Sequence, residues 1–295
     1  MIERKPLDSN AFALMLLLTM LWGAQQVVIK LTANDISFVM QAGIRSIVAT
    51  VLVLAWAAYK RIVLWRRDGT LWPGVIAGVL FGGEFVFIYA GLEHTAASRM
   101  VVFIYLAPVL TALGLHRLVP GERLVPGQWA GVLLSFVGVA LAFWEGLDAP
   151  GNTWVGDLCG VIAAGLWAAT TVLVRATNLS RATATKTLFY QLGVSALILP
   201  LASIAMGERG VISLTPLALA SLAYQGVIVA FASYLAWFWL LTRYLAARLA
   251  VFSFLSPLFG VLAGVIVLGE PLRPWFAAAA ALVVAGIVLV NLRQR

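Results

Sequence analysis

Two charged residues, Arg45 and Glu84, lie inside apolar segments of the sequence, near 37–59 and 72–92. Each stands eight residues from one end of its segment, so in helices that cross a membrane both would lie roughly 12 Å deep. A charge there costs about 2.5 to 3.5 kcal/mol on insertion scales. We therefore predict a buried ion pair. In the alternative hypothesis Glu84 binds a ligand's ammonium group or a proton and Arg45 binds a carboxylate, as suits a zwitterion.

Two segments carry a tryptophan, a polar residue and a basic residue at successive four-residue intervals, so that the three share one helical face. Trp22 and Trp167 lie deeper than interfacial indoles usually do, and we predict that they form walls of a substrate cavity. Ordinary helix packing is the alternative. Lys30 and Arg175 end their helices, where snorkelling to the headgroups explains them as well as substrate binding does. The two sets are Trp22, Gln26 and Lys30, and Trp167, Thr171 and Arg175.

Tyrosine and glutamine side chains recur inside the apolar segments, where an unpartnered polar group is costly. Hydrogen bonds between helices are the commoner outcome for such groups. We predict that three of them, Tyr89, Tyr105 and Tyr234, face a substrate. The others are Tyr190, Tyr224, Gln25, Gln41, Gln191 and Gln225.

Pro108 and Pro257 occur in the interior of two further apolar segments. Proline has no backbone N–H, and its ring clashes with the preceding turn, so each residue should bend its helix. Two such kinks at equivalent places suit a gate, and we predict a gating role for both prolines. Static bends that shape a helical bundle are the alternative, which sequence alone leaves open.

The composition indicates which elements must position these residues. Of 295 residues, 62% are hydrophobic and 11% are charged, so most of the protein's outer surface must face lipid. Ten segments are long enough to cross the bilayer, which predicts an all-α integral membrane protein with ten transmembrane helices. Besides the two segments above, they are the charge-free stretches 9–29, 100–116, 124–144, 158–174, 187–207, 210–242, 249–269 and 274–292.

Several kinds of chemistry have no support in the sequence. Cys159 is the single cysteine, and the only histidines are His94 and His116, so neither an intrachain disulfide nor a metal cluster is expected. No phosphate-binding G-x-x-x-x-G-K-[ST] motif occurs. An intramembrane enzyme would need carboxylates, histidines or a nucleophile and base gathered at one depth. We therefore expect no enzyme, no cofactor and no metal.

The net charge of +8 is explained by topology rather than by a nucleic-acid partner. Fifteen of the 20 Lys and Arg residues fall at the chain ends or in every second connection between the predicted helices. By the positive-inside rule, both termini and these connections are cytoplasmic. We expect a multi-pass membrane protein, in contact with lipid and not with nucleic acid.

The chain contains an internal repeat, visible when it is shifted by about 145 to 150 positions. The predicted units are 1–148 and 149–295, each with five helices, so the second should enter the membrane from the opposite side. Inverted repeats are typical of transporters, although duplication as a route to a stable bundle is the alternative. The blocks beginning at Leu21, Gln41, Ala97 and Gly121 match those beginning at Leu166, Gln191, Ala246 and Gly269.

These blocks resemble the EamA family of the drug/metabolite transporter superfamily. The most specific elements are the tryptophan near the start of each repeat, the proline of each fourth helix, and the motifs Gly121-Glu122 and Gly269-Glu270. The resemblance implies a cavity lined by helices 1–4 and 6–9, with helices 5 and 10 supporting them from outside. Among subfamilies, the chain is similar to bacterial inner-membrane exporters of aromatic and other amino acids. Glu122 and Glu270 themselves suit helix capping or loop bracing.

Together these features predict a secondary transporter that exports small amphipathic metabolites, chiefly amino acids, by alternating access. A carrier of phosphorylated sugars or nucleotide-sugars is an alternative, but it would need several buried cations, and only Arg45 is deep. Facilitated diffusion and proton coupling both stay open, because Glu84 is the one acidic residue placed mid-membrane. The oligomeric state is also open.

Overall fold

The computed structural model describes residues 5–147 and 153–292, and this part of the chain is helical without any β-strand. The predicted boundary between 148 and 149 lies outside the described residues. Eight helical segments are long and apolar enough to cross a membrane. They are α1 (Ser9–Leu31), α2 (Phe38–Tyr59), α3 (Leu71–Leu92), α4 with α5 (Ala97–Ile104, Ala107–Leu118), α8 (Trp154–Ala176), α9 (Ala184–Ala205), α10 with η2 and α11 (Pro216–Ala223, Tyr224–Ser233, Tyr234–Arg243), and α12 with η3 and α13 (Ala246–Ala250, Val251–Phe254, Leu255–Leu268).

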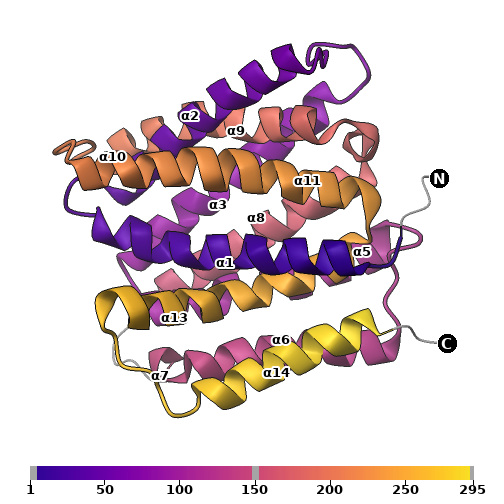
Figure 1. Ribbon diagram of the computed structural model, residues 1–295, viewed down its shortest axis with the longest axis vertical. Helices are drawn as coiled ribbons and strands as arrows, with labels where there is room; N and C mark the ends of the chain where they lie inside the picture. Colours follow the sequence, from indigo (N-terminus) through magenta and orange to yellow (C-terminus); the bar gives the residue numbers. More distant parts are fainter. Residues whose placement is uncertain (1–4, 148–152, 293–295) are drawn as a thin grey trace.

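Two further predicted segments coincide with shorter apolar helices, α6 (Pro126–Ala142) and α14 (Phe276–Asn291). One-turn elements, α7 (Trp144–Leu147) and η1 (Asn178–Arg181), complete the described chain. The long helices lie roughly side by side (Figure 1). We call the end of the bundle where α1 begins and α14 ends the proximal end, and the opposite end the distal end.

Contacts between the two halves of the chain hold the bundle together. α1 packs along α13, α2 packs along α9, and α8 packs against both α3 and α5. In Figure 1, helices of the first half therefore alternate with helices of the second. A side chain of one half that points into the bundle consequently meets side chains of the other.

The α6 and α14 helices form a closely packed pair at one edge of the bundle (Figure 1). A Cβ atom at Gly131 would lie 2.7 Å from the Gly286 carbonyl oxygen, so the backbones touch only because glycine occupies this position. The Gln128 side chain also donates a 3.0 Å hydrogen bond to the Val290 carbonyl. The pair contacts the rest of the bundle much less than its members contact each other.

The predicted kinks at both prolines are confirmed. The fourth apolar segment breaks between α4 and α5 just before Pro108, and the segment containing Pro257 runs through the 3₁₀ turn η3 before α13 begins. The missing N–H and the ring of each proline disrupt the turn that precedes it. α9, by contrast, continues through Pro200. The gating role of Pro108 and Pro257 stays a prediction.

Residues 224–233 form a π-helical segment, η2, which the sequence analysis did not predict. Such segments are rare, and they frequently occur at functional sites because they rotate the side chains that follow them. Here η2 leads directly into Tyr234.

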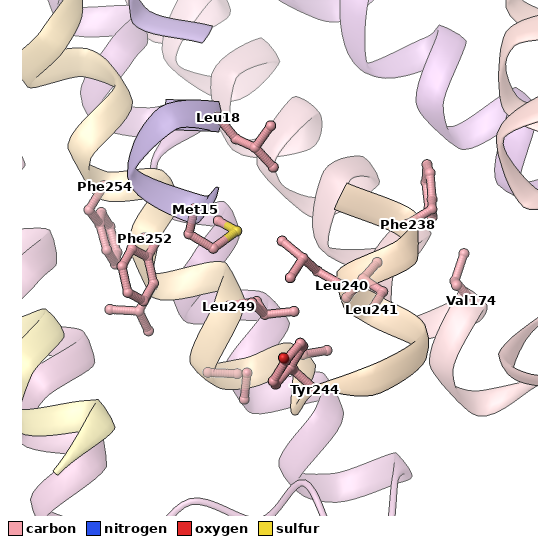
Figure 2. Packing of buried hydrophobic residues seen from close by; sticks show 14 of the residues in the cluster. Met15, Leu18, Val174, Phe238, Leu240, Leu241, Tyr244, Leu249, Phe252 and Phe254 are labelled. Atoms are coloured by element: carbon pink, nitrogen blue, oxygen red, sulfur yellow. The ribbon is translucent and has the colours of Figure 1, made fainter. Parts of the chain in front are cut away.

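The proximal half of the bundle is filled by large apolar side chains that are almost fully buried (Figure 2). They come from α1, α8, α11, α12 and η3, so they join both halves of the chain. We call them the proximal core; they are Met15, Leu18, Val174, Phe238, Leu240, Leu241, Tyr244, Leu249, Phe252 and Phe254.

A buried lysine holds the connection between α2 and α3 against α9 at the same end. The Lys186 ammonium lies 2.8 Å from the Asp68 carboxylate and also donates to the Arg66 carbonyl. Its hydrogen bond, together with that of Thr70, lowers the pKa of the Asp68 carboxyl to about 2. This connection therefore stays charged and attached to α9 at every physiological pH.

The close approach of α6 and α14 predicts a stability difference between two glycine substitutions. Gly131→Ala should lower the free energy of unfolding by about 1 to 3 kcal/mol, because its Cβ would meet backbone atoms that cannot move aside. Gly165→Ala in α8 is the matched control, since no atom lies within 4 Å of its Cβ position. Thermal unfolding in detergent measures both; equal midpoints would contradict this account of the pair.

Candidate functional site

Arg45 lies in α2 with only 1% of its surface exposed. Its guanidinium carbon lies 4.5 Å from the centroid of the Phe85 ring, a cation–π contact with α3. Its Nη2 atom has no hydrogen-bond partner among the described residues. The positive charge acts on the hydroxyl groups of Tyr89 and Tyr234, which lie on different helices.

Glu84 lies in α3 and is 7% exposed. No salt bridge joins Arg45 to Glu84 within the described residues, so the predicted ion pair is not formed here, although the Arg45 charge acts on the Glu84 carboxyl group. α2 contacts α3 only weakly and packs mainly along α9, and the Arg45 guanidinium lies over the Phe85 ring. Among the described residues the ion pairs are Lys30–Glu270, Arg99–Asp157, Arg175–Glu122, Lys186–Asp68 and Arg273–Glu145.

The two groups belong to one region, because the Arg45 charge acts on the Glu84 carboxyl group. Both act electrostatically on the Tyr234 hydroxyl, and Glu84 also acts on that of Tyr105. A buried charge is unfavourable unless something neutralises it. The region thus holds a cationic donor and a carboxyl group that no salt bridge joins, with the Tyr234 hydroxyl within electrostatic reach of both.

Aromatic rings connect the first half of the chain to α11 at this level. The Trp22 ring lies 6.3 Å from Tyr234 and 5.8 Å from Trp237, and Phe81 lies 5.9 Å from Tyr234. The Trp22 indole N–H donates a 2.9 Å hydrogen bond to the Ser233 hydroxyl at the end of η2. The indole is therefore held in one orientation.

A second aromatic group surrounds the break in the fourth segment. Tyr105 follows α4 directly, and its ring lies 5.9 Å from Trp167 and 6.4 Å from Phe254. The Thr171 hydroxyl is less available to a substrate, since it donates to the Trp167 carbonyl of its own helix. Tyr89 stacks on Phe38, with centroids 5.7 Å apart.

The structure thus brings most of the predicted substrate residues near Arg45 and Glu84, and it adds two phenylalanines that sequence reasoning missed. Phe81 and Phe85 lie 5.3 Å apart and link the Tyr234 ring to the Arg45 guanidinium. Their four-residue spacing in the segment that holds Glu84 was the available signal. The roles of these residues in binding stay predictions.

The two basic residues Lys30 and Arg175 do not simply extend toward headgroups. Lys30 pairs with Glu270 at 2.5 Å near the distal end. Arg175 is buried, and it pairs with Glu122 near the proximal end. Snorkelling is therefore the wrong explanation for Arg175, because the Glu122 carboxylate neutralises its charge inside the protein.

The chain is similar over its whole length to known membrane transporters. An uncharacterized transporter of Archaeoglobus fulgidus is 28% identical over 98% of this chain and 99% of its own length. Proteins named "Probable amino-acid metabolite efflux pump" from Salmonella typhimurium and Escherichia coli are 24% and 22% identical, each aligned over 94% of this chain and 93% of the relative.

A crystal structure that is 22% identical has the same fold, with a TM-score of 0.81 over 96% of this chain and 99% of that chain. The model of the EamA-like transporter family matches twice, over residues 10–144 and 154–292. The two matches cover all ten apolar helices and every residue of the candidate site. The chain therefore belongs to the EamA-like transporter family.

Proposed function

We propose that the protein is a secondary transporter that exports small zwitterionic metabolites, amino acids and aromatic ones among them, across the bacterial inner membrane by alternating access. The observation that carries this proposal is the position of two buried residues, Arg45 and Glu84, which no salt bridge joins within the described residues and which both act on the Tyr234 hydroxyl. The family supports transport, and the names of two relatives support amino-acid metabolites and the outward direction.

A zwitterion satisfies both charges at once. The Arg45 guanidinium can bind a carboxylate through two parallel hydrogen bonds, and the Glu84 carboxylate can accept from an ammonium group. Each charge costs about 2.5 to 3.5 kcal/mol to hold in the membrane, so a bound amino acid would relieve a penalty that the empty protein bears. An anionic phosphate ester would leave Glu84 unpaired and repel it.

The aromatic residues suit the remainder of such a substrate. Trp22 and Phe81 each form an edge-to-face contact with Tyr234, and such rings favour apolar and aromatic side chains. In this proposal the charges select the amino-acid backbone and the rings select its side chain. Tyr105 of the first half and Trp167 of the second half contribute a further pair of rings.

In the proposed topology all ten apolar helices span the membrane, and the proximal end is cytoplasmic. The contacts support two inverted repeats. In the sequence repeat, α1 corresponds to α8, and α13 corresponds to α5. A rotation that exchanges the two halves would turn the α1–α13 pair into the α8–α5 pair, and both pairs are packed. The α6–α14 pair would map onto itself.

Alternating access follows from this symmetry. If each half can adopt the conformation of the other, the central site opens in turn to each side of the membrane. The site residues come from both halves, so their relative movement would change access to the substrate. The broken helices at Pro108 and Pro257 supply equivalent bends for that movement.

Counterflow of labelled amino acid into liposomes that hold the pure protein tests the function, and ligand analogues test the site. Arg45→Gln should weaken binding of an amino acid at least about tenfold, because truncating one buried charge partner costs about 2 to 5 kcal/mol. It should not change binding of the corresponding amine, which lacks the carboxylate. Glu84→Gln should weaken binding of the amino acid but not binding of the corresponding acid, which lacks the ammonium group.

The folded yield of the same variants separates this site from an internal ion pair. Since neither charge has a partner in the empty protein, each single substitution should leave the yield unchanged or raise it. A yield that falls in both single variants and recovers in the double variant would support the ion pair. If each single variant lost affinity equally for the amino acid, the amine and the deaminated acid, the roles assigned to Arg45 and Glu84 would be excluded.

The aromatic wall predicts a change in substrate preference. Trp22→Ala should weaken binding of aromatic amino acids by about two- to tenfold relative to binding of aliphatic ones, since an aromatic pair contributes about 0.5 to 1.5 kcal/mol. Trp239→Ala is the matched control, because this exposed indole contacts Arg243 rather than the site. The ratio of competition constants in counterflow measures the effect; identical ratios in both variants would return Trp22 to a packing role.

A further inference from the structure

Two pairs of oppositely charged residues lie at opposite ends of the bundle and occupy equivalent positions in the repeat. Glu122 pairs with Arg175 at the proximal end, and Glu270 pairs with Lys30 at the distal end. Glu122 and Glu270 are 148 positions apart, and Lys30 and Arg175 are 145 apart. We call them the proximal clamp (Glu122, Arg175) and the distal clamp (Glu270, Lys30).

The proximal clamp is complete and buried. The Glu122 carboxylate accepts from Arg175 and also from the backbone N–H groups of Ala246 and Ala247, at 3.0 and 3.2 Å. Arg175 donates in addition to the Leu241 carbonyl at 3.0 Å. Both side chains are only 2% exposed. One carboxylate thus joins the connection before α6 to the end of α8 and the start of α12.

The distal clamp makes only part of the equivalent set. Glu270 lies 2.5 Å from the Lys30 ammonium, but the side chains are 44% and 65% exposed. The repeat places Ala97 and Ser98 opposite the two N–H donors of the proximal clamp, at an offset of 149. No hydrogen bond within the described residues joins their N–H groups to Glu270. The start of α4 is therefore not attached to this clamp.

The equivalent helical faces show the same asymmetry. In α8, Trp167 is half-buried and Thr171 is buried, as is Arg175 beyond it. In α1, Trp22 is half-buried but Gln26 is exposed. Trp22 packs against the apolar cluster that contains the proximal core. The face that leads to the proximal clamp is thus buried, whereas the face that leads to the distal clamp is partly exposed.

Other carboxylates at the distal end make complete contacts. Glu208 accepts from the backbone N–H groups of Val39 and Met40 at 3.1 and 3.2 Å, so it attaches the end of α9 to the start of α2. Asp35 accepts from the hydroxyl groups of Ser213 and Thr215. The incomplete contact at this end is the distal clamp, between α1 and the connection after α13.

We propose that the two clamps close in alternation and thereby hold the two access states. This inference rests on the proposed function, because it assumes two inverted halves. In the state seen here the proximal clamp is complete. In the other state Glu270 accepts from Lys30 and from the N–H groups of Ala97 and Ser98 while Glu122 is hydrated.

The chemistry of the clamps favours such an exchange. A buried ion pair is tolerated only when further hydrogen bonds satisfy its atoms, which the proximal clamp achieves with backbone donors. When that end opens, water can hydrate both charges, so neither is left unpaired in a dry interior. Because each closed clamp joins a glutamate to a basic side chain and to the start of a helix, closing one offsets the cost of opening the other.

Thiol accessibility without substrate tests the proposal independently of transport. The single cysteine is first removed as Cys159→Ser, and a reporter is introduced as Thr171→Cys or Gln26→Cys. Labelling by a membrane-impermeant maleimide is then timed from each side of oriented vesicles. Adding Glu122→Gln should speed labelling of Thr171→Cys from the proximal side about tenfold, within the usual range for coupled states, and slow that of Gln26→Cys from the distal side.

Glu270→Gln is the matched control, since it removes the equivalent carboxylate from the other clamp. It should leave Thr171→Cys protected. Equal labelling of Thr171→Cys with and without Glu122→Gln, or equal effects of both glutamine variants, would overturn the proposal. If Glu122→Gln does not accumulate, Arg175→Lys replaces it, because a lysine cannot reach Glu122 and the Leu241 carbonyl with a rigid fork. A protein without counterflow could still pass this test, so the two proposals fail separately.

Discussion

The cost of an unpaired polar group in hydrocarbon determines most of this structure. Every backbone N–H and carbonyl that crosses the membrane must be bonded within the protein, which leaves helices as the available element. The same cost explains why Lys186, Arg175 and Glu122 are each buried with several partners. Arg45 and Glu84 are the exceptions. The absence of a salt bridge at either residue is informative because every other buried charge described above has one.

Much of the fold could be predicted because hydrophobic length and proline act locally. Charge-free stretches located the helices, and the missing N–H of Pro108 and Pro257 located the breaks. The partners of Arg45 could not be predicted in this way. Depth along a helix follows from counting residues, but the direction of a side chain depends on which helix packs beside it. Arg45 and Glu84 share a depth and yet point to different neighbours.

The clamps and η2 were beyond sequence reasoning for another reason. Glu122 meets Arg175 across 53 positions, and Glu270 meets Lys30 across 240, so no local pattern records either contact. The motif Gly-Glu suggested a helix cap, and Glu122 does bond two N–H groups of a helix start. That helix, α12, belongs to the other half of the chain. The local chemistry was right, and only its partner was unforeseen.

The α6–α14 pair has a consequence for how the two halves of the chain depend on each other. Its contacts run antiparallel, since Gly131 lies beside Gly286 and Gly138 lies beside the Ala279 carbonyl. Each half supplies one helix, so neither half covers its own glycine-lined face. A half produced alone would expose a backbone surface that only a closely fitting helix can cover.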